Sequence, residues 1–102
     1  MSVVVVATVT PKTDQVEAVR QALLAAVPKV HAEPGCELYA VHEADGLFVM
    51  VERWESREAL KVHGRAEALT TLGGELADKL AAPLDVRRLT PLPAGDPDKG
   101  AL

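Results

Sequence analysis

The chain has 102 residues, 48% hydrophobic and 25% charged, a size and composition typical of one globular domain. Its formal net charge is −4 and it has no run of Lys or Arg, which argues against nucleic acid as a partner. One cysteine cannot build a disulfide framework, and no apolar stretch reaches the roughly 18 residues of a membrane span. We therefore expect a cytoplasmic protein without a signal peptide, working away from membranes.

The first third of the chain predicts a strand and a helix. Residues 3–9 form a β-branched apolar run closed by Pro11, which predicts a strand buried on both faces. Asp14 and Glu17 have the spacing of a capping box, and apolar residues then recur at helical intervals up to residue 30. Pro28 is predicted to kink or end this helix.

Residues 36–54 carry the strongest hairpin signal, two strand-like runs around Asp45-Gly46, a dipeptide that favours a type I′ turn. If these two residues form the loop, Ala44 faces Leu47 and every other pair follows. One sheet face then carries Tyr39, Val41, Glu43, Phe48, Met50, Glu52 and Trp54, and the other carries Leu38, Ala40, His42, Leu47, Val49, Val51 and Arg53. Both faces are largely apolar, so we expect helices on one and a second sheet or a partner chain on the other.

The second half of the chain predicts helical segments, a strand and a tail. Ser56 is the expected N-cap of a short helix that Gly64 interrupts, and a later helix is expected to be weakened at Gly73-Gly74. Leu69, Leu72, Leu76 and Leu80 form the apolar face of that later helix. Residues 84–89 predict a last strand with imperfect alternation, for which a bulge is expected. We expect residues 1–92 to form the domain and residues 93–102 a flexible tail.

The resulting order is βαββαβ, which predicts an α+β, ferredoxin-like fold with an antiparallel sheet. Such a sheet has one apolar face that its own helices do not cover. Packing that face against a second copy gives a two-fold homodimer, the commonest soluble oligomer.

A metal site is not predicted, because His31, Cys36, His42 and His63 have no spacing typical of metal ligands. There is also no glycine-rich loop with a phosphate-binding lysine. Cys36 could act as a nucleophile beside a histidine, or it could simply pack as a small buried residue.

Glu52 is unusual because its ionisable side chain lies between Met50 and Trp54 on the aromatic-rich face. Tyr39 is directly opposite and is the expected hydrogen-bond partner, either in a purely structural pair or at the wall of a pocket. His63, on the inner face of the short helix, is either a core histidine or a general base. We expect Tyr39, Glu52, Trp54 and His63 to meet in an apolar pocket between the helices and the sheet.

The order Glu33-Pro34-Gly35-Cys36, Tyr39, the hairpin, Glu52-Arg53-Trp54, Ser56 and His63 resembles the antibiotic biosynthesis monooxygenase family, over about residues 3–92. The resemblance implies a dimeric α+β barrel with one pocket in each subunit. It also implies oxidation of a quinol-like or polyketide aromatic substrate by O₂ without flavin, haem or metal. In that chemistry the deprotonated substrate passes an electron to O₂, and the radical pair recombines to a peroxide that collapses to the quinone.

The resemblance also implies roles for individual residues. His63 would transfer a proton or orient the substrate, Trp54 would wall the pocket, and Tyr39 with Glu52 would form a supporting pair. Phe48, Met50 and Leu60 would complete the substrate-binding surface. Some members of the family carry Asn, Tyr or Arg in the pocket, whereas Met50 and Leu60 make nearby inward positions apolar in this chain. The first strand has no Asn, which argues against haem cleavage.

Two other functions remain open. The domain could be a non-catalytic dimeric barrel, a stress-response or small-ligand-binding module whose pocket is filled by Trp54, Phe48 and Met50. It could also be an isomerase of a small metabolite. Open space between Trp54 and His63 would favour an enzyme and close packing there a scaffold. Two titratable groups within reach of one ligand would favour the isomerase.

Overall fold

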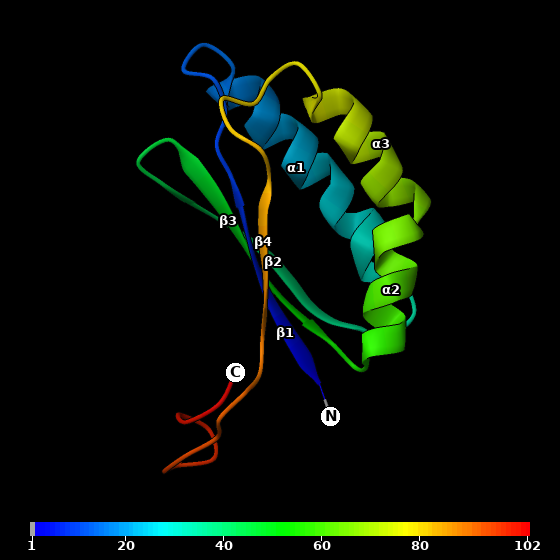
Figure 1. Cartoon of the computed structure of the whole chain (residues 1–102), viewed down its shortest axis with the longest axis vertical. Helices are drawn as coiled ribbons and strands as arrows, with labels where there is room; N and C mark the ends of the chain where they lie inside the picture. Colours follow the sequence, from blue (N-terminus) through cyan, green and yellow to red (C-terminus); the bar gives the residue numbers. More distant parts are fainter. Residues whose placement is uncertain (1) are drawn as a thin grey trace.

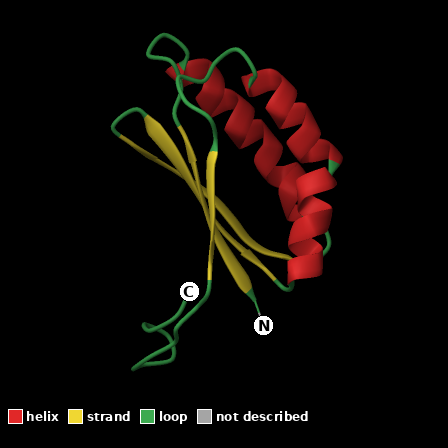
Figure 2. Ribbon diagram, viewed as in Figure 1, coloured by secondary structure: helices red, strands yellow, loops and turns green. Residues whose placement is uncertain are grey.

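The computed structural model describes residues 2–102 and shows a four-stranded antiparallel sheet with helices on one face (Figures 1 and 2). The elements in chain order are β1 (Val3–Val9), α1 (Val16–His31), β2 (Cys36–Ala44), β3 (Leu47–Trp54), α2 (Arg57–Arg65), α3 (Glu67–Leu76) and β4 (Asp85–Leu89). The strand order is β2-β3-β1-β4, which confirms the predicted ferredoxin-like α+β fold. None of the helices in residues 2–102 is long and apolar enough to cross a membrane.

The central hairpin has the predicted register. Ala44 pairs with Leu47 and Tyr39 pairs with Glu52. Asp45 and Gly46 have φ angles of 51° and 78°, the positive values that a type I′ turn requires at both loop residues. The only register shift in this pairing lies at the start of β2, between Cys36 and Leu38.

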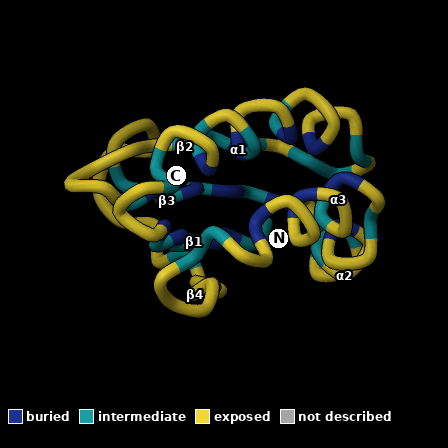
Figure 3. The backbone as a smooth tube through the Cα atoms, turned by 90° about the horizontal axis from the view of Figure 1, so that it is seen from above, coloured by how far each residue is buried: buried dark blue, intermediate teal, exposed yellow. Residues whose placement is uncertain are grey.

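The core lies between the helices and the sheet, where the buried parts of the chain face each other (Figure 3). Helix α1 packs on β2, and α3 packs beside α1. The side chains of Val5, Val9, Leu23, Phe48 and Trp54 are at most 1% exposed. Burial of these large apolar groups is the main force that holds the two layers together.

The opposite face of the sheet has no helix over it in residues 2–102 (Figure 1). In β1 the side chains of Ala7 and Val9 are buried toward the helices, whereas Val6 and Thr8 on the other face are only half-buried. Val4 on that face is nevertheless buried, so the prediction that β1 is buried on both faces is only partly confirmed for the single chain.

The predicted capping box at the start of the long helix is wrong. Helix α1 begins at Val16 and Gln15 takes the N-cap position, without a side-chain hydrogen bond. Pro28 lies in the last turn and does not end the helix, which continues to His31.

The predicted N-cap of the short helix is confirmed, since Ser56 Oγ accepts a hydrogen bond of 3.1 Å from the Ala59 amide. Glycine interrupts neither later helix: α2 continues through Gly64, and α3 includes Gly73-Gly74. Leu80 lies outside α3 and pairs with Pro11 in an isolated bridge. The pairing of β4 with β1 has a continuous register, so the expected bulge is absent from this ladder.

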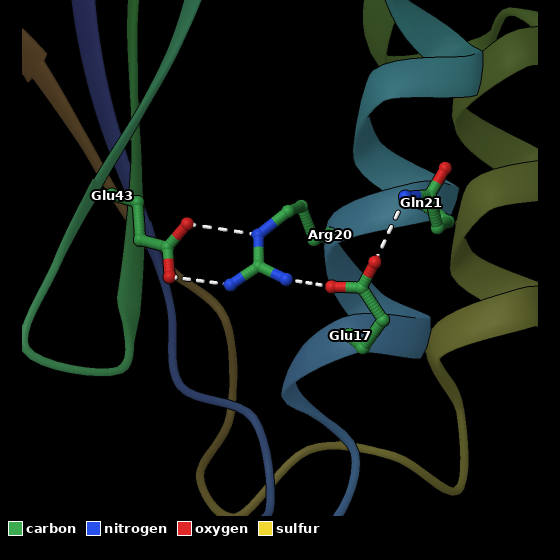
Figure 4. A network of polar contacts seen from close by, with 4 residues as sticks. All are labelled: Glu17, Arg20, Gln21 and Glu43. Carbon is green, nitrogen blue, oxygen red and sulfur yellow. Dashed lines mark hydrogen bonds and ion pairs between the residues drawn. The ribbon is translucent and has the colours of Figure 1, made fainter.

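A polar network joins α1 to the far end of the hairpin (Figure 4). Arg20 donates from Nε and Nη2 to the two carboxylate oxygens of Glu43, at 2.9 and 2.6 Å. Glu17 pairs with Arg20 and accepts a 3.0 Å hydrogen bond from Gln21. These bonds from Arg20 hold the pKa of Glu43 below its ordinary value. A bidentate pair of this kind fixes the helix over the hairpin.

Candidate functional site

A cavity of about 340 Å³ lies between the β1–β4 side of the sheet and helices α2 and α3. The sheet contributes two cross-strand rows to it, Tyr39-Glu52-Val5-Arg88 and Met50-Ala7-Val86. The helices contribute mainly apolar side chains, Leu60, Leu69, Leu72 and Leu76 among them. This is the apolar hollow with few polar groups that is typical of a ligand site.

The buried end of the cavity holds one histidine between two carboxylates. His63 Nδ1 lies 2.8 Å from Glu33 Oε1, and His63 Nε2 lies 3.9 Å from Glu52 Oε1. Trp54 donates its indole N–H to the same Glu52 oxygen at 3.0 Å. The side chains of His63 and Glu52 are each 6% exposed and that of Glu33 is 11% exposed, so water screens these contacts weakly.

Aromatic contacts fix the imidazole ring of His63. The Trp54 ring stacks on it with a centroid distance of 4.4 Å and an interplanar angle of 28°. The Tyr39 ring meets it edge-on at 5.9 Å. With Glu33 bound to Nδ1, the ring has little freedom to turn, and Nε2 is the nitrogen nearer to Glu52 at the cavity wall.

The turn between α1 and β2 places Glu33 against α2. Gly35 has φ 80°, and a Cβ there would come within 2.5 Å of Ala59 Cβ, so only glycine allows this approach. The Glu55 amide donates to the Gly35 carbonyl at 2.9 Å, which ties the end of β3 to the same turn. The Glu-Pro-Gly segment thus brings the Glu33 carboxylate to His63 on the inner face of α2.

Burial raises the pKa of two groups next to His63. Desolvation raises the pKa of the Glu52 carboxyl, against the opposing effects of the Trp54 hydrogen bond and of His63. Desolvation, and then the nearby carboxylates, raise the pKa of Tyr39 well above its ordinary value, which keeps the phenol neutral. Within residues 2–102, Glu33 Oε2 is buried without a hydrogen-bond partner. A carboxylate can only accept a hydrogen bond, so the contact with Glu33 suits the His63 tautomer that carries its hydrogen on Nδ1 and leaves Nε2 toward Glu52.

The structure brings most of the predicted site residues together. Tyr39, Met50, Glu52, Leu60 and His63 all line the cavity. Two others do not.

Trp54 is fully buried and packs against His63, outside the cavity wall, and Phe48 lies in the core, with Arg20 5.7 Å from its ring centroid. The expected hydrogen bond between Tyr39 and Glu52 is wrong, since Glu52 accepts from Trp54 instead. Trp54 and His63 stack on each other, so there is no open space between them. At this point the structure agrees with the prediction for a non-catalytic scaffold. The open space lies beside His63.

Sequence reasoning missed Glu33 and the basic residues Arg57, Lys61 and Arg88 of the cavity. Glu33 directly precedes a Pro-Gly turn, a position that could have marked it as fixed in space. Arg57 and Lys61 have the i,i+4 spacing of one helix face, which was the signal available for them. Arg88 could not be found without the pairing of β4.

Cys36 does not have the properties of an activated nucleophile. Desolvation, and then the Glu33 and Glu52 carboxylates, raise the pKa of its thiol, whereas a reactive cysteine needs a lowered one. Over residues 2–102, no group of three or more His, Cys, Asp or Glu residues is arranged to hold a metal ion.

Comparison with known proteins identifies the family and supports the fold. Residues 2–72 match the protein family described as antibiotic biosynthesis monooxygenase. The putative monooxygenase Rv0793 of Mycobacterium tuberculosis is 33% identical over 92 residues, 88% of this chain and 91% of that protein. Its solved structure superposes with a TM-score of 0.86, covering 94% of this chain and all of the other. The structure of PA3566 from Pseudomonas aeruginosa is 28% identical, with a TM-score of 0.83 over 89% of this chain and 94% of the other.

Proposed function

Because the chain belongs to the antibiotic biosynthesis monooxygenase family, we propose that it oxidises a quinol-like or polyketide aromatic substrate with O₂, using no flavin, haem or metal. The observation that carries this proposal is His63, whose Nδ1 is held by Glu33 while Nε2 faces Glu52 at the buried end of an apolar cavity. An enzyme of this kind needs to bind, deprotonate and shield its substrate, and these residues supply the three functions.

The first step is removal of a proton from a substrate hydroxyl or acidic C–H group. His63 Nε2 is the base, and Glu33 stabilises the imidazolium that forms. The 3.9 Å between Nε2 and Glu52 Oε1 allows a substrate oxygen to approach both atoms at ordinary hydrogen-bond distances of about 2.8 Å. Desolvation raises the pKa of the Glu52 carboxyl, and in its protonated form this group can donate to that oxygen.

In the second step the substrate anion gives one electron to O₂, and the substrate radical and superoxide combine through a new C–O bond. Protonation of the peroxide is followed by loss of the remaining hydrogen of the same carbon as a proton, and the electrons of that C–H bond form the carbonyl as the O–O bond breaks and water leaves. One oxygen atom stays in the product and the other leaves as water, and the substrate supplies all the electrons. Met50, Leu60 and Leu72 surround this step with apolar groups, which limits side reactions with water.

Oxygen consumption with a panel of hydroquinones and anthrone-type phenols tests the proposal. We expect uptake by the wild type and a loss of about 10²-fold or more in His63→Ala. His42→Ala is the matched control, because His42 is exposed and lies outside the cavity. Equal rates for wild type and His63→Ala would remove His63 from the mechanism.

An isomerase is the second candidate, because His63 and Glu52 are two titratable groups within reach of one ligand. The two functions differ in their need for O₂. Turnover that continues under anaerobic conditions would support the isomerase, whereas turnover that stops without O₂ supports the oxygenase. Binding of aromatic ligands without any turnover would support the non-catalytic small-ligand module.

The homodimer also remains a proposal, supported by the half-buried apolar face that the helices leave open. Leu38, Ala40, Leu47 and Val49 lie on this face. We expect Val49→Glu to halve the mass measured by light scattering, because a charge would be buried in the interface. Leu24→Glu is the control, since Leu24 is 49% exposed on α1. A monomeric wild type would overturn the dimer.

A further inference from the structure

Three basic side chains surround the outer part of the cavity, although the chain as a whole carries a net charge of −4. Arg57 and Lys61 come from α2 and Arg88 from β4. All three are exposed, and within residues 2–102 none of them forms an ion pair with a carboxylate. The positive charge of this region is therefore not neutralised by the protein itself.

Two other arginines of the sheet, in contrast, form ion pairs with carboxylates. Arg87, next to Arg88 on β4, pairs with Asp85 at 3.3 Å, and Arg53 on β3 pairs with Glu37 at 3.1 Å. Arg57 and Lys61 are four residues apart on one helix, where like charges destabilise the helix. An arrangement that costs helix stability and gathers unpaired cations at a cavity is consistent with recognition of an anion.

The sheet register sets the distance between the two ends of the cavity. Glu52, Val5 and Arg88 are consecutive positions in one cross-strand row, so Glu52 and Arg88 are two strand spacings apart. Two spacings correspond to about 10 Å. A fused two-ring aromatic with polar groups at opposite ends spans such a distance.

We propose that the ligand of this cavity is an aromatic carboxylate. Its rings lie against the apolar wall, its carboxylate contacts Arg57, Lys61 and Arg88, and its hydroxyl points toward His63 and Glu52. The guanidinium groups favour a carboxylate because each can donate two parallel hydrogen bonds to it. The part of this inference that concerns the hydroxyl rests on the proposed function, whereas binding of the carboxylate does not.

Calorimetric titration with 6-hydroxy-2-naphthoate and 6-hydroxy-2-naphthamide tests the proposal. The two compounds share their rings and hydroxyl and differ in one charge. We expect the carboxylate to bind about tenfold more tightly than the amide at low salt, and the preference to fall at high salt. The double variant Arg57→Gln/Arg88→Gln should lose the preference. Arg65→Gln/Arg87→Gln removes the same charge from the same two elements outside the cavity and should keep it.

The outcomes separate this inference from the proposed function. Equal affinities for the two compounds, or a preference that survives in the double variant, would overturn the carboxylate site and leave the oxygenase standing. Preferential binding of the carboxylate by a protein that consumes no O₂ would support the site and overturn the oxygenase. Failure of both compounds to bind would overturn the carboxylate site, whereas the oxygenase is decided by oxygen uptake with the hydroquinone panel.

Discussion

The contact between Glu33 and His63 makes a sharp prediction about catalysis. In Glu33→Gln we expect kcat to fall by about 10²-fold or more with little change in KM. A carboxylate can only accept a hydrogen bond, so it keeps the hydrogen on His63 Nδ1, 2.8 Å away. An amide can donate as well as accept at the same distance, so it no longer holds the hydrogen on Nδ1, and its NH₂ group stabilises the tautomer with the hydrogen on Nε2. A ring protonated at Nε2 cannot take the substrate proton.

The size of the effect follows from the position of Glu33. It does not line the cavity, so it acts through His63 and cannot contribute more than His63 does. General bases contribute about 10²–10⁴-fold, which sets the upper limit. The losses should not multiply: the double variant Glu33→Gln/His63→Ala should be no slower than His63→Ala alone. Stability should change by about 1 kcal/mol or less, because Oε2 is already buried without a partner.

The assay combines oxygen uptake with imidazole ¹⁵N NMR, which reports directly which nitrogen of His63 carries the hydrogen. Affinity for 6-hydroxy-2-naphthoate should stay within about twofold, which excludes a collapsed cavity. Glu37→Gln is the matched control, an exposed glutamate that pairs with Arg53. Wild-type kinetics in Glu33→Gln, an unchanged tautomer, or multiplied losses in the double variant would refute the reasoning.

Further predictions concern Glu52, Gly64 and Trp54. Burial raises the pKa of Glu52 above its ordinary 4.5, so its charge costs stability as the pH rises through the folded-state pKa. Glu52→Gln should therefore unfold at higher urea than wild type at pH 8, with the gain vanishing near pH 4; a gain that grows toward pH 4 would contradict this. Gly64→Leu should block ligand binding yet stabilise α2 by up to about 1 kcal/mol, because Gly64 lines the cavity and a Cβ there meets no atom within 4 Å. Gly74→Leu, at a position of α3 that does not line the cavity, should keep ligand binding in the same calorimetric titration. Trp54→Ala should cost about 3–5 kcal/mol in urea unfolding followed by circular dichroism, as expected for a fully buried aromatic side chain.

The hairpin could be read from the sequence because its register depends on one local feature. Asp45-Gly46 forces a two-residue turn, and every pair from Ala44–Leu47 to Tyr39–Glu52 then follows. The helix ends could not be read as well. Gly64 and Gly73 remain helical because the helices pack on other elements, and such packing outweighs a propensity difference of about 1 kcal/mol.

Part of the site could also be predicted from local sequence, because side chains alternate between the two faces of a strand. The period of two placed Tyr39, Met50 and Glu52 on one face, and that face does line the cavity. The same period put Trp54 on this face, but it could not tell that Trp54 lies behind His63. Arg88 joined the site only through the pairing of β4 with β1, which is a contact between residues far apart in the chain.

The position of the cavity follows from incomplete coverage of the sheet. Helices α1 and α3 pack against each other and α1 lies on β2, whereas β4 is an edge strand of the sheet (Figure 1). All residues of β4 are exposed. Val86 is 54% exposed and Leu84 45% exposed, although both are apolar and line the cavity. A purely apolar ligand would cover these two side chains but would also remove water from Arg88 without replacing it, which is unfavourable. An aromatic carboxylate covers the apolar side chains and neutralises the guanidinium in the same position. It therefore complements both the apolar and the charged groups of this cavity wall.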